Sequence, residues 1–228
     1  MARAHRFTDR AAAGVALAGA VQRIALHPPW VVLGLPRGGV AVAAEVAARL
    51  GAPLDVMPVR KIGMPGHAEW AIGAIAWGGV TVRDPRIGRD AEGLEATFDA
   101  LVARERRELE RRERLFRADL APLALADKTV ILVDDGIATG LTMLAAVRAA
   151  RAAGAARIVA AAPVAAPSSL GLIRAEADDV VIVNAPARLL AIGEGYEHFE
   201  QLEDAEVLRL LAVRRPPPRA HAGSVTSI

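Results

Sequence analysis

The chain has 228 residues, of which 53% are apolar, and its formal net charge is +2. That length is enough for one domain with a substantial hydrophobic core. The small net charge argues against a nucleic-acid partner, because nucleic-acid-binding domains usually carry a strongly basic surface. The chain contains no cysteine, which excludes disulfides, thiolate metal sites and cysteine nucleophiles.

The first apolar run, AAAGVALAGAV at residues 11–21, follows a basic flank and has the small residues of an export signal. However, Asp9 lies in that flank and Arg23 follows closely, which disfavours a signal peptide. The apolar positions fall at roughly helical spacing, so an amphipathic surface helix is favoured. No run reaches the ~18 uninterrupted apolar residues of a membrane span. We therefore expect a cytoplasmic protein without a membrane partner.

Short aliphatic runs alternate with helix-like segments along the chain. Because the runs are continuous rather than alternating with polar residues, they predict an α/β fold with a parallel sheet covered by helices on both faces. The predicted strands are residues 30–35, 54–60, 129–133, 157–164 and 179–184, with a further strand or hairpin in residues 71–82. One predicted helix follows the first strand and ends near Leu50, and a second runs from Thr142 to Ala153. A third connects the last two strands. Residues 61–70 are predicted to be a loop.

Two segments differ from this pattern. Residues 92–117 include RERRELERRER, yet they keep a helical stripe of apolar residues and favourable pairs such as Glu108 with Arg112. A long solvated helix is favoured over a nucleic-acid surface, because glutamates interleave with the arginines. Residues 214–228 are rich in Pro and small polar residues and predict a disordered tail after a single domain that spans residues 1–213.

The strongest chemical signal is ILVDDGIATGLT at residues 131–142. Ligands bind beyond the carboxyl ends of parallel strands, and Asp134 and Asp135 lie at such an end. The loop that follows offers backbone N–H groups, hydroxyls and a helix N-terminus, which suit a phosphate monoester. The carboxylates would repel that phosphate, so they suit hydroxyl groups, a metal ion or both. Together these features indicate a ribose 5-phosphate ligand.

Other proteins also place an acidic pair after an apolar strand. Response-regulator receivers do so, but their acidic cluster lies near the start of the chain. P-loop enzymes have a Walker-B acid, but they also need GxxxxGK[ST], which this sequence lacks. An accidental pair is disfavoured by the Gly-Thr loop that follows it.

Residues 130–142 resemble the phosphoribosyl-pyrophosphate (PRPP) signature of the type I phosphoribosyltransferases. In that signature four apolar residues precede two acids, two small or apolar residues, a small residue, Thr-Gly, a variable residue and Thr. The resemblance implies that Asp134 and Asp135 bind the ribose 2- and 3-hydroxyls, directly or through Mg²⁺ and its waters. It also implies a 5-phosphate loop with Thr139 and Thr142 as hydroxyl donors, made of Gly136, Ile137, Ala138, Thr139, Gly140, Leu141 and Thr142.

The segment LPRGGV at residues 35–40 supports this resemblance. It resembles the pyrophosphate loop of the family, which often contains a cis peptide bond before a residue other than proline. The resemblance implies that Arg37, Gly38 and Gly39 bind PRPP, since glycine lets the backbone approach a ligand and arginine brings a fixed charge. A routine strand-to-helix turn is the alternative.

The segment VRKIGMPG at residues 59–66 resembles the mobile loop of the adenine and orotate enzymes. The resemblance implies that Arg60 and Lys61 are pyrophosphate ligands, whereas a solvated basic pair is the alternative. His67 and Glu69 lie on the same predicted lid, and a catalytic role for them is left open.

The resemblance implies transfer of the phosphoribosyl group from PRPP to a small-molecule acceptor through an oxocarbenium-like state, with release of pyrophosphate. Mg²⁺, Arg37, Arg60 and Lys61 would stabilise the leaving group. Closure of residues 61–70 would exclude water from the cation. Members of the family are often dimers, so the resemblance is compatible with a homodimer, and the sequence itself does not fix the oligomeric state. A PRPP-binding regulator, and a hydrolase or phosphorylase of PRPP, are the alternatives.

The acceptor stays open. Ala138 stands where the hypoxanthine-guanine enzymes have a third acid, which disfavours a 6-oxopurine. The predicted hood, about residues 184–207 together with the N-terminal helix, resembles no characterised hood. With FTDRAAAG near the start of the chain, it resembles a group of stand-alone bacterial phosphoribosyltransferases of undefined acceptor. Tyr196 and Phe199 either stack on a ring or belong to the hood core, which we favour.

Overall fold

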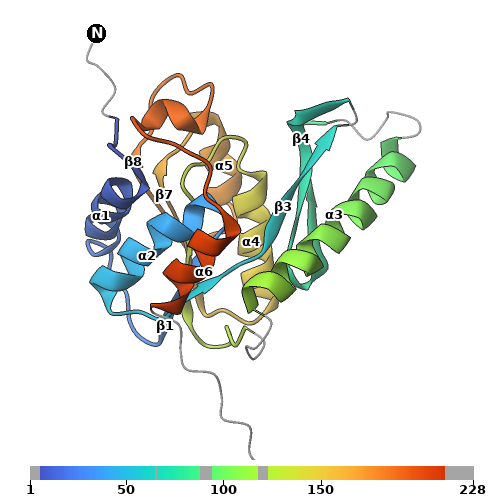
Figure 1. Ribbon diagram of the computed structural model, residues 1–228. Coiled ribbons are helices and arrows are strands. Elements are labelled where there is room, and N and C mark those ends of the chain that lie inside the picture. Colours follow the sequence, from blue (N-terminus) through green and yellow to red (C-terminus); the bar gives the residue numbers. More distant parts are fainter. Residues whose placement is uncertain (1–5, 65, 88–93, 118–122, 214–228) are drawn as a thin grey trace, which may run out of the picture.

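The computed structural model describes residues 6–64, 66–87, 94–117 and 123–213. A five-stranded parallel sheet forms its centre, in the order β2-β1-β6-β7-β8 (Figure 1). The strands are β1 (Trp30–Gly34), β2 (Leu54–Val56), β6 (Thr129–Val133), β7 (Arg157–Val164) and β8 (Asp179–Asn184).

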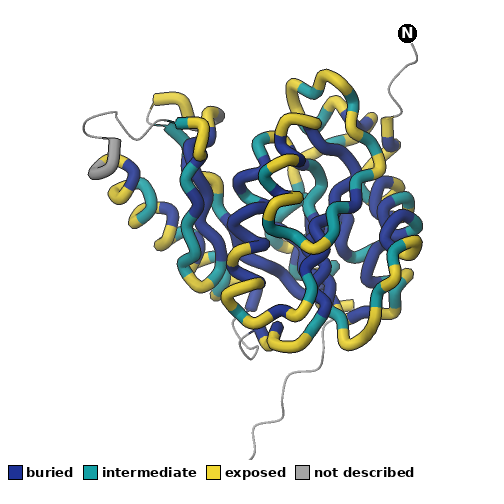
Figure 2. The backbone as a smooth tube through the Cα atoms, turned by 180° about the vertical axis from the view of Figure 1, so that it is seen from behind, coloured by how far each residue is buried: buried dark blue, intermediate teal, exposed yellow. Residues whose placement is uncertain are grey.

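Helices cover both faces of this sheet, and β1, β6 and β7 are buried almost throughout (Figure 2). Val32 and Ile131 pack toward one set of helices, and their neighbours Val31 and Leu132 pack toward the other. This two-sided burial explains why the strands read as continuous apolar runs. One face is covered by α1 (Arg10–Val21), α2 (Gly38–Leu50) and α6 (Asp204–Ala212), the other by α4 (Leu141–Ala152) and α5 (Pro167–Arg174).

A three-stranded antiparallel sheet, in the order β3-β4-β5, stands beside the parallel sheet. It consists of β3 (Val59–Met64), β4 (His67–Ala76), a short 3₁₀ turn η1 (Trp77–Gly79) and β5 (Val80–Arg83). The long helix α3 (Leu94–Arg117) packs on one face of it, where Phe98 and Leu109 contact Ile62 and Ile75. We call β3, β4, β5 and α3 the arm.

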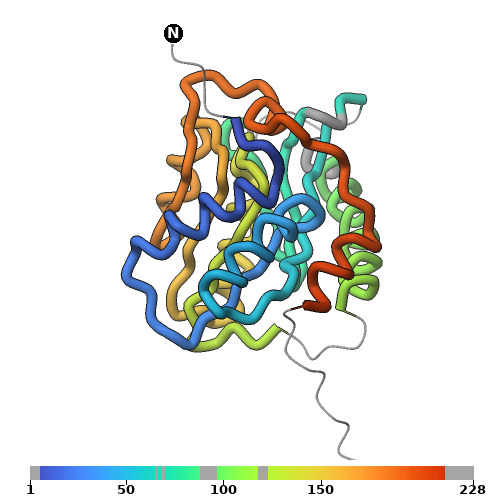
Figure 3. The backbone as a smooth tube through the Cα atoms, turned by 60° about the vertical axis from the view of Figure 1, so that its left-hand side comes forward, coloured from blue at the N-terminus to red at the C-terminus, as the bar shows by residue number. Residues whose placement is uncertain are grey.

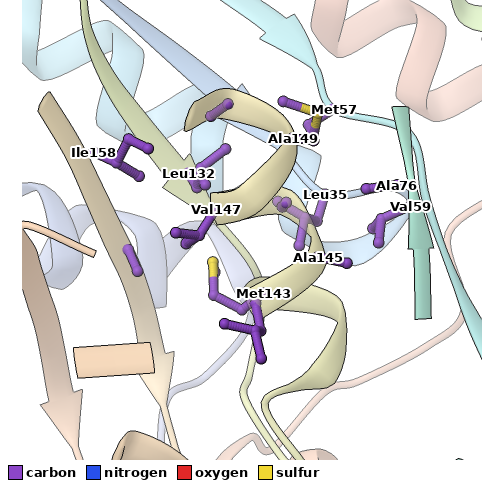
Figure 4. Close-up of a cluster of buried hydrophobic side chains, with 14 of the residues drawn as sticks. Leu35, Met57, Val59, Ala76, Leu132, Met143, Ala145, Val147, Ala149 and Ile158 are labelled. Atoms are coloured by element: carbon purple, nitrogen blue, oxygen red, sulfur yellow. The ribbon is translucent and has the colours of Figure 1, made fainter. Parts of the chain in front are cut away.

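Helix α4 lies between the arm and the parallel sheet (Figure 4). On one side its Val147 faces Leu132 of the parallel sheet, and on the other side Ala145 lies near Val59 and Ala76 of the arm. The small side chains of α4 let the arm approach closely, which explains the many alanines of this helix. The arm is therefore held against the same helix whose N-terminus follows Asp134 and Asp135 in the chain.

Two predictions about the arm were wrong. Residues 54–60 were predicted to be one strand, but β2 ends at Val56 and β3 starts at Val59 in another sheet. Pro58 has no N–H to continue the ladder. Residues 61–70 were predicted to be a loop, but most of them belong to β3 and β4. Gly63 lies at a register shift in that hairpin, so the glycine marks a bulge rather than a loop.

β4 begins at His67, four residues before the strand or hairpin predicted for residues 71–82, and the other helices and strands with predicted bounds lie within two residues of them in the part of the chain described. The predicted tail, residues 214–228, lies outside the described residues. After β8 the chain forms a 3₁₀ turn η2 (Ile192–Gly195) and then α6. Within the described ranges, none of the helices has the length and apolar character needed to cross a membrane.

A buried ion pair joins the arm to the edge of the parallel sheet. Arg117, at the end of α3, donates from Nη2 to Oδ2 of Asp55 in β2 over 3.1 Å, and its Nε lies 3.2 Å from the same oxygen. The exposed fractions of the two side chains are only 6% and 9%. Removing one partner of such a pair leaves a buried charge without its counter-ion.

We predict that Arg117→Met lowers the free energy of unfolding by about 3 kcal/mol. Arg114, which is exposed on the same helix, provides the control, since Arg114→Met should change it by less than about 0.5 kcal/mol. Urea denaturation of both variants measures the difference. Equal stability of the two variants would show that the pair does not hold the arm.

Candidate active site at the carboxyl edge of the sheet

The site forms where β1 and β6 end side by side. These strands are parallel neighbours, and Gly34 pairs with Val133 at their last residues. The backbone N–H of Leu35 donates to the carbonyl of Val133 over 2.8 Å, so the segment after β1 stays beside β6. The sheet register therefore brings the predicted pyrophosphate loop and the predicted signature together, although about 100 residues separate them in sequence.

Glycines 38 and 39 allow this close approach. A Cβ atom on Gly38 would lie 1.8 Å from Oδ2 of Asp135, and one on Gly39 would lie 2.8 Å from the Cα of Asp134. No side chain fits in either place. The sequence suggested that these glycines admit a ligand. The structure shows that Gly38 lies against Asp135, and that Gly39 lies against the carbonyl of Val133 and the backbone of Asp134. The Pro36–Arg37 peptide bond between β1 and these glycines is cis, as the resemblance implied.

Asp135 is held from two sides. Nε of Arg10, the first residue of α1, donates to its Oδ2 over 2.8 Å, and the hydroxyl of Tyr196 donates to its backbone carbonyl over 2.5 Å. Both contacts are shielded, since the exposed fractions of the Arg10 and Asp135 side chains are 12% and 16%. Arg10 was not predicted from the sequence, because nothing in its spacing relates it to a strand end 125 residues away.

The residues around Arg10 come from both ends of the chain. Residues 6–10 and 185–200, which we call the hood, lie side by side (Figure 3). Phe7 donates its N–H to the carbonyl of Gly195 and accepts from the N–H of Glu197, each over 2.8 Å. Residues 204–207 were also predicted to belong to the hood. They form the start of α6, which packs against α2 instead.

Three aromatic and cationic side chains stack inside the hood. The guanidinium of Arg10 lies 4.0 Å from the ring centroid of Phe199, and that ring stacks on Tyr196 with a centroid distance of 4.8 Å. Tyr196 is only 1% exposed, so it belongs to the hood core, as the sequence favoured. Ile192 also reaches the site, because a Cβ on Gly136 would lie 2.2 Å from its Cγ2 atom.

The two carboxyl groups have unequal electrostatic surroundings. Burial raises the pKa of Asp134 well above its usual value, and the charge of Asp135 raises it further. Burial also raises the pKa of Asp135, but the hydrogen bond from Arg10 opposes this. Oδ1 of Asp134 accepts the backbone N–H of Asp135 over 2.9 Å. The pair is therefore short of positive charge and hydrogen-bond donors.

This deficit fits a bound cation or hydroxyl-bearing ligand. Mg²⁺ prefers oxygen ligands and commonly takes only one or two carboxylates, with waters and phosphate oxygens completing its shell. The described residues contain no group of three or more acidic or histidine side chains that could hold a metal by themselves. Asp134 and Asp135 thus suit Mg²⁺ that shares its coordination with a substrate.

The loop after the acids leads to the N-terminus of α4. Gly140 precedes the helix with a φ of +83°, which favours glycine. The first-turn N–H groups of α4 have no acceptor within the helix, so they are available to an anion. Thr139 and Thr142 are half-buried there and Ala138 is exposed. The predicted ligands Ile137 and Leu141 are core residues with 2% and 0% exposure, so their side chains do not face a ligand. The backbone N–H of Ile137 already donates to the carbonyl of Val164 over 2.9 Å.

The structure separates the predicted basic ligands. Nη1 of Arg37 lies 3.8 Å from Oδ1 of Asp204 on α6, a long ion pair. Arg60 donates from Nε and Nη2 to Oε2 of Glu105 over 3.0 and 2.8 Å, and Glu105 is only 6% exposed. Arg60 is thus bound to α3. Lys61 is exposed and, by strand alternation, lies on the opposite face of β3.

The two candidate lid residues lie on β4. His67 is its first residue and is exposed. The side chain of Glu69 lies outside the described part of the structure.

Comparison with known proteins identifies the family. The sequence model of the phosphoribosyl transferase domain matches residues 11–190, which contain the glycine turn, both acids and the helix N-terminus after them. The chain belongs to the phosphoribosyl transferase family. The chain also shares 42% identity over 205 residues with the Mycobacterium tuberculosis protein named "Putative phosphoribosyl transferase Rv0571c". The match covers 90% of this chain and 46% of that protein, so the chain spans about half the length of the curated relatives it matches.

Solved structures agree with the fold. TT1426 from Thermus thermophilus has a TM-score of 0.77 and 41% identity, over 92% of this chain and 100% of that chain. The AQ2163 protein from Aquifex aeolicus has a TM-score of 0.50 at 15% identity, over 81% of this chain and 78% of that one, and supports the fold alone. The parallel sheet flanked by helices is the type I fold that the sequence predicted.

The raised pKa of Asp134 predicts a pH-dependent gain of stability in Asp134→Asn. An acid whose pKa is higher in the folded state loses stability as pH rises from its unfolded value, near 3.8, through the folded value. Asparagine mimics the protonated form, so the variant should be more stable than the wild type at pH 8, and the gain should vanish toward pH 4.

Urea denaturation at several pH values measures this effect. Asp99→Asn changes an exposed carboxyl on α3 and should follow the wild type at every pH. A variant Asp134→Asn that is less stable than the wild type at pH 8 would contradict the assigned burial.

Proposed function

We propose that this phosphoribosyl transferase binds PRPP with Mg²⁺ and transfers the 5-phosphoribosyl group to a small-molecule acceptor, with release of pyrophosphate. One observation carries the proposal. A pair of largely buried carboxylates that is short of positive partners lies between a glycine turn and the N-terminus of a helix. One ligand with a phosphate, vicinal hydroxyls and a second anionic group satisfies all three features.

Each part of PRPP corresponds to one part of this edge. The ribose hydroxyls donate to Asp134 and Asp135, which have few protein donors of their own. The 5-phosphate accepts from the backbone N–H groups before and within the first turn of α4, and from the hydroxyls of Thr139 and Thr142. The acids and the phosphate loop thus bind opposite ends of one sugar, so the carboxylates need not contact the phosphate.

The pyrophosphate lies on the other side, along the turn after β1. Gly38 and Gly39 bring backbone there, and Arg37 has only a long ion pair to exchange for a phosphate contact. Lys61 extends from the α4-facing side of β3 and supplies a second positive charge. Arg60, by contrast, contributes by fixing β3 to α3 through Glu105, and reaches pyrophosphate only if that pair opens.

Bond cleavage moves negative charge onto the pyrophosphate while the sugar becomes oxocarbenium-like. Arg37 and Lys61 stabilise the leaving group because their charges are already in place. Asp134 and Asp135 would hold Mg²⁺, which supplies further positive charge to the leaving oxygens when bound. The β3–β4 hairpin, residues 59–76, closes over the site and limits water at the sugar.

The long helix α3 gives little support to the alternative of a nucleic-acid-binding regulator. Arg111 and Arg112 both pair with Glu108, and Arg104 pairs with Glu105. These guanidinium groups are partly neutralised by their own helix, so the surface has less positive charge than its arginine content suggests.

We predict that the double variant Asp134→Asn with Asp135→Asn binds PRPP in the presence of Mg²⁺ at least about 100-fold more weakly than the wild type. Each lost hydrogen bond to a charged group is worth about 1.5–3 kcal/mol. Isothermal titration calorimetry measures the affinity, and Asp99→Asn serves as a control for loss of a surface charge. Near-native affinity in the double variant would overturn the proposal.

We also expect one acceptor among free bases and small amines to give pyrophosphate release from PRPP. A coupled assay for pyrophosphate detects it, and Lys61→Met should lower the rate about 100-fold because the leaving group loses one cation. Arg114→Met is the control for loss of a surface charge. Tight PRPP binding without turnover on any acceptor would favour the regulator instead.

A further inference from the structure

We propose that Arg10 is a positioning residue that divides the work of the two adjacent carboxylates. It holds Asp135 as the acceptor for a sugar hydroxyl and leaves Asp134 as the carboxylate that faces a divalent cation. The part that concerns the sugar rests on the proposed function, whereas the part that concerns the cation can be tested without PRPP.

Arg10 is fixed by three separate contacts. Its Nε donates to Oδ2 of Asp135 over 2.8 Å, its Nη1 donates to the carbonyl of Glu200 over 2.8 Å, and its guanidinium lies over the ring of Phe199. A side chain held in this way has already lost its rotamer freedom, and its charge cannot move away when a ligand arrives. Arg10 therefore acts as a built-in counter-ion for one acid only.

Asp135 is fixed just as firmly on its own side. Tyr196 binds its backbone carbonyl, and its carboxylate lies where a Cβ on Gly38 would be, so there is little room for another rotamer. One carboxylate oxygen is occupied by Arg10, and the charge is largely neutralised. Such a group remains a good acceptor for a hydroxyl, but it is a poor second ligand for a cation.

Asp134 has the opposite surroundings. Its Oδ1 accepts a single backbone N–H, from Asp135, and no donor in the described ranges of the chain reaches its Oδ2. The ion pairs formed by the described residues include none to Asp134. Arg10 gives its hydrogen bond to Asp135 and none to Asp134. A cation bound beside Asp134 would supply the direct counter-charge that this carboxyl group lacks.

The net charge of the two carboxylates and Arg10 predicts how loss of the arginine changes cation binding. Asp134, Asp135 and Arg10 together carry one negative charge, and without Arg10 they carry two. Loss of Arg10 should therefore strengthen binding of a bare divalent cation, because both carboxylates now attract it. The same loss should weaken PRPP binding, because Asp135 is no longer held in place. A merely structural arginine would weaken both.

Mn²⁺ is the probe for the first effect, followed by electron paramagnetic resonance in the absence of PRPP. We expect Arg10→Met to bind Mn²⁺ about tenfold more tightly than the wild type, and Arg10→Lys to stay near the wild type. Asp134→Asn should remove Mn²⁺ binding. The control is Arg23→Met, just beyond the end of the same helix, since Arg23 is exposed and its side chain donates to the carbonyl of Gly19, away from the acids.

Calorimetry with PRPP at a saturating Mg²⁺ concentration measures the second effect, since the cation site is then filled in every variant. Arg10→Met should bind about tenfold more weakly than the wild type, and Arg10→Lys should restore most of the affinity. If Mn²⁺ binding is unchanged or falls in Arg10→Met, or is absent in every protein, the division of roles is overturned. If the wild type binds Mn²⁺ as expected but does not bind PRPP under any condition, the proposed function fails while the Mn²⁺ comparison still decides the role of Arg10.

Discussion

Two carboxylates side by side at the end of a buried strand repel one another and resist desolvation, and the surrounding structure is arranged around that cost. The turn after β1 carries glycines because Asp134 and Asp135 occupy the space of their side chains. The hood supplies one guanidinium, enough to neutralise one acid but not both. What remains is a local excess of negative charge, held in a rigid frame, that a hydroxylated ligand or a cation relieves.

Helix α4 links this charge to the rest of the molecule. Its N-terminus follows the acids in sequence, its Val147 faces the parallel sheet, and its Ala145 lies near the arm. One short helix thus fixes the distance between the phosphate-binding end of the site and the strand that carries Lys61. The buried pair of Arg117 and Asp55 anchors the far end of the arm, so a closing motion would bend the hairpin rather than detach α3.

The sequence predicted the parallel sheet because strands buried on both faces contain uninterrupted aliphatic residues, and it predicted the family from the acids and the loop after them. Prediction from the sequence was wrong or incomplete where one residue type can serve two structural purposes. Glycine in 61–70 marked a bulge rather than a loop. Nothing in the sequence indicated that Arg60 pairs with Glu105 of α3 whereas Lys61 lies on the opposite face of β3. Arg10 could not be found at all, because only the folded chain brings it to Asp135.

The hood also imposes an order on assembly. Its residues 6–10 are synthesised almost 190 residues before Phe199, on which Arg10 stacks. Once β6 has been made, the strands that carry the acids can already pair, but Tyr196 and Phe199 are not yet present to support Asp135 and its counter-ion. The site is therefore complete only after most of the strands that support it have formed. A chain shortened at either end of the hood would keep the sheet and lose the restraint on its least compensated charge.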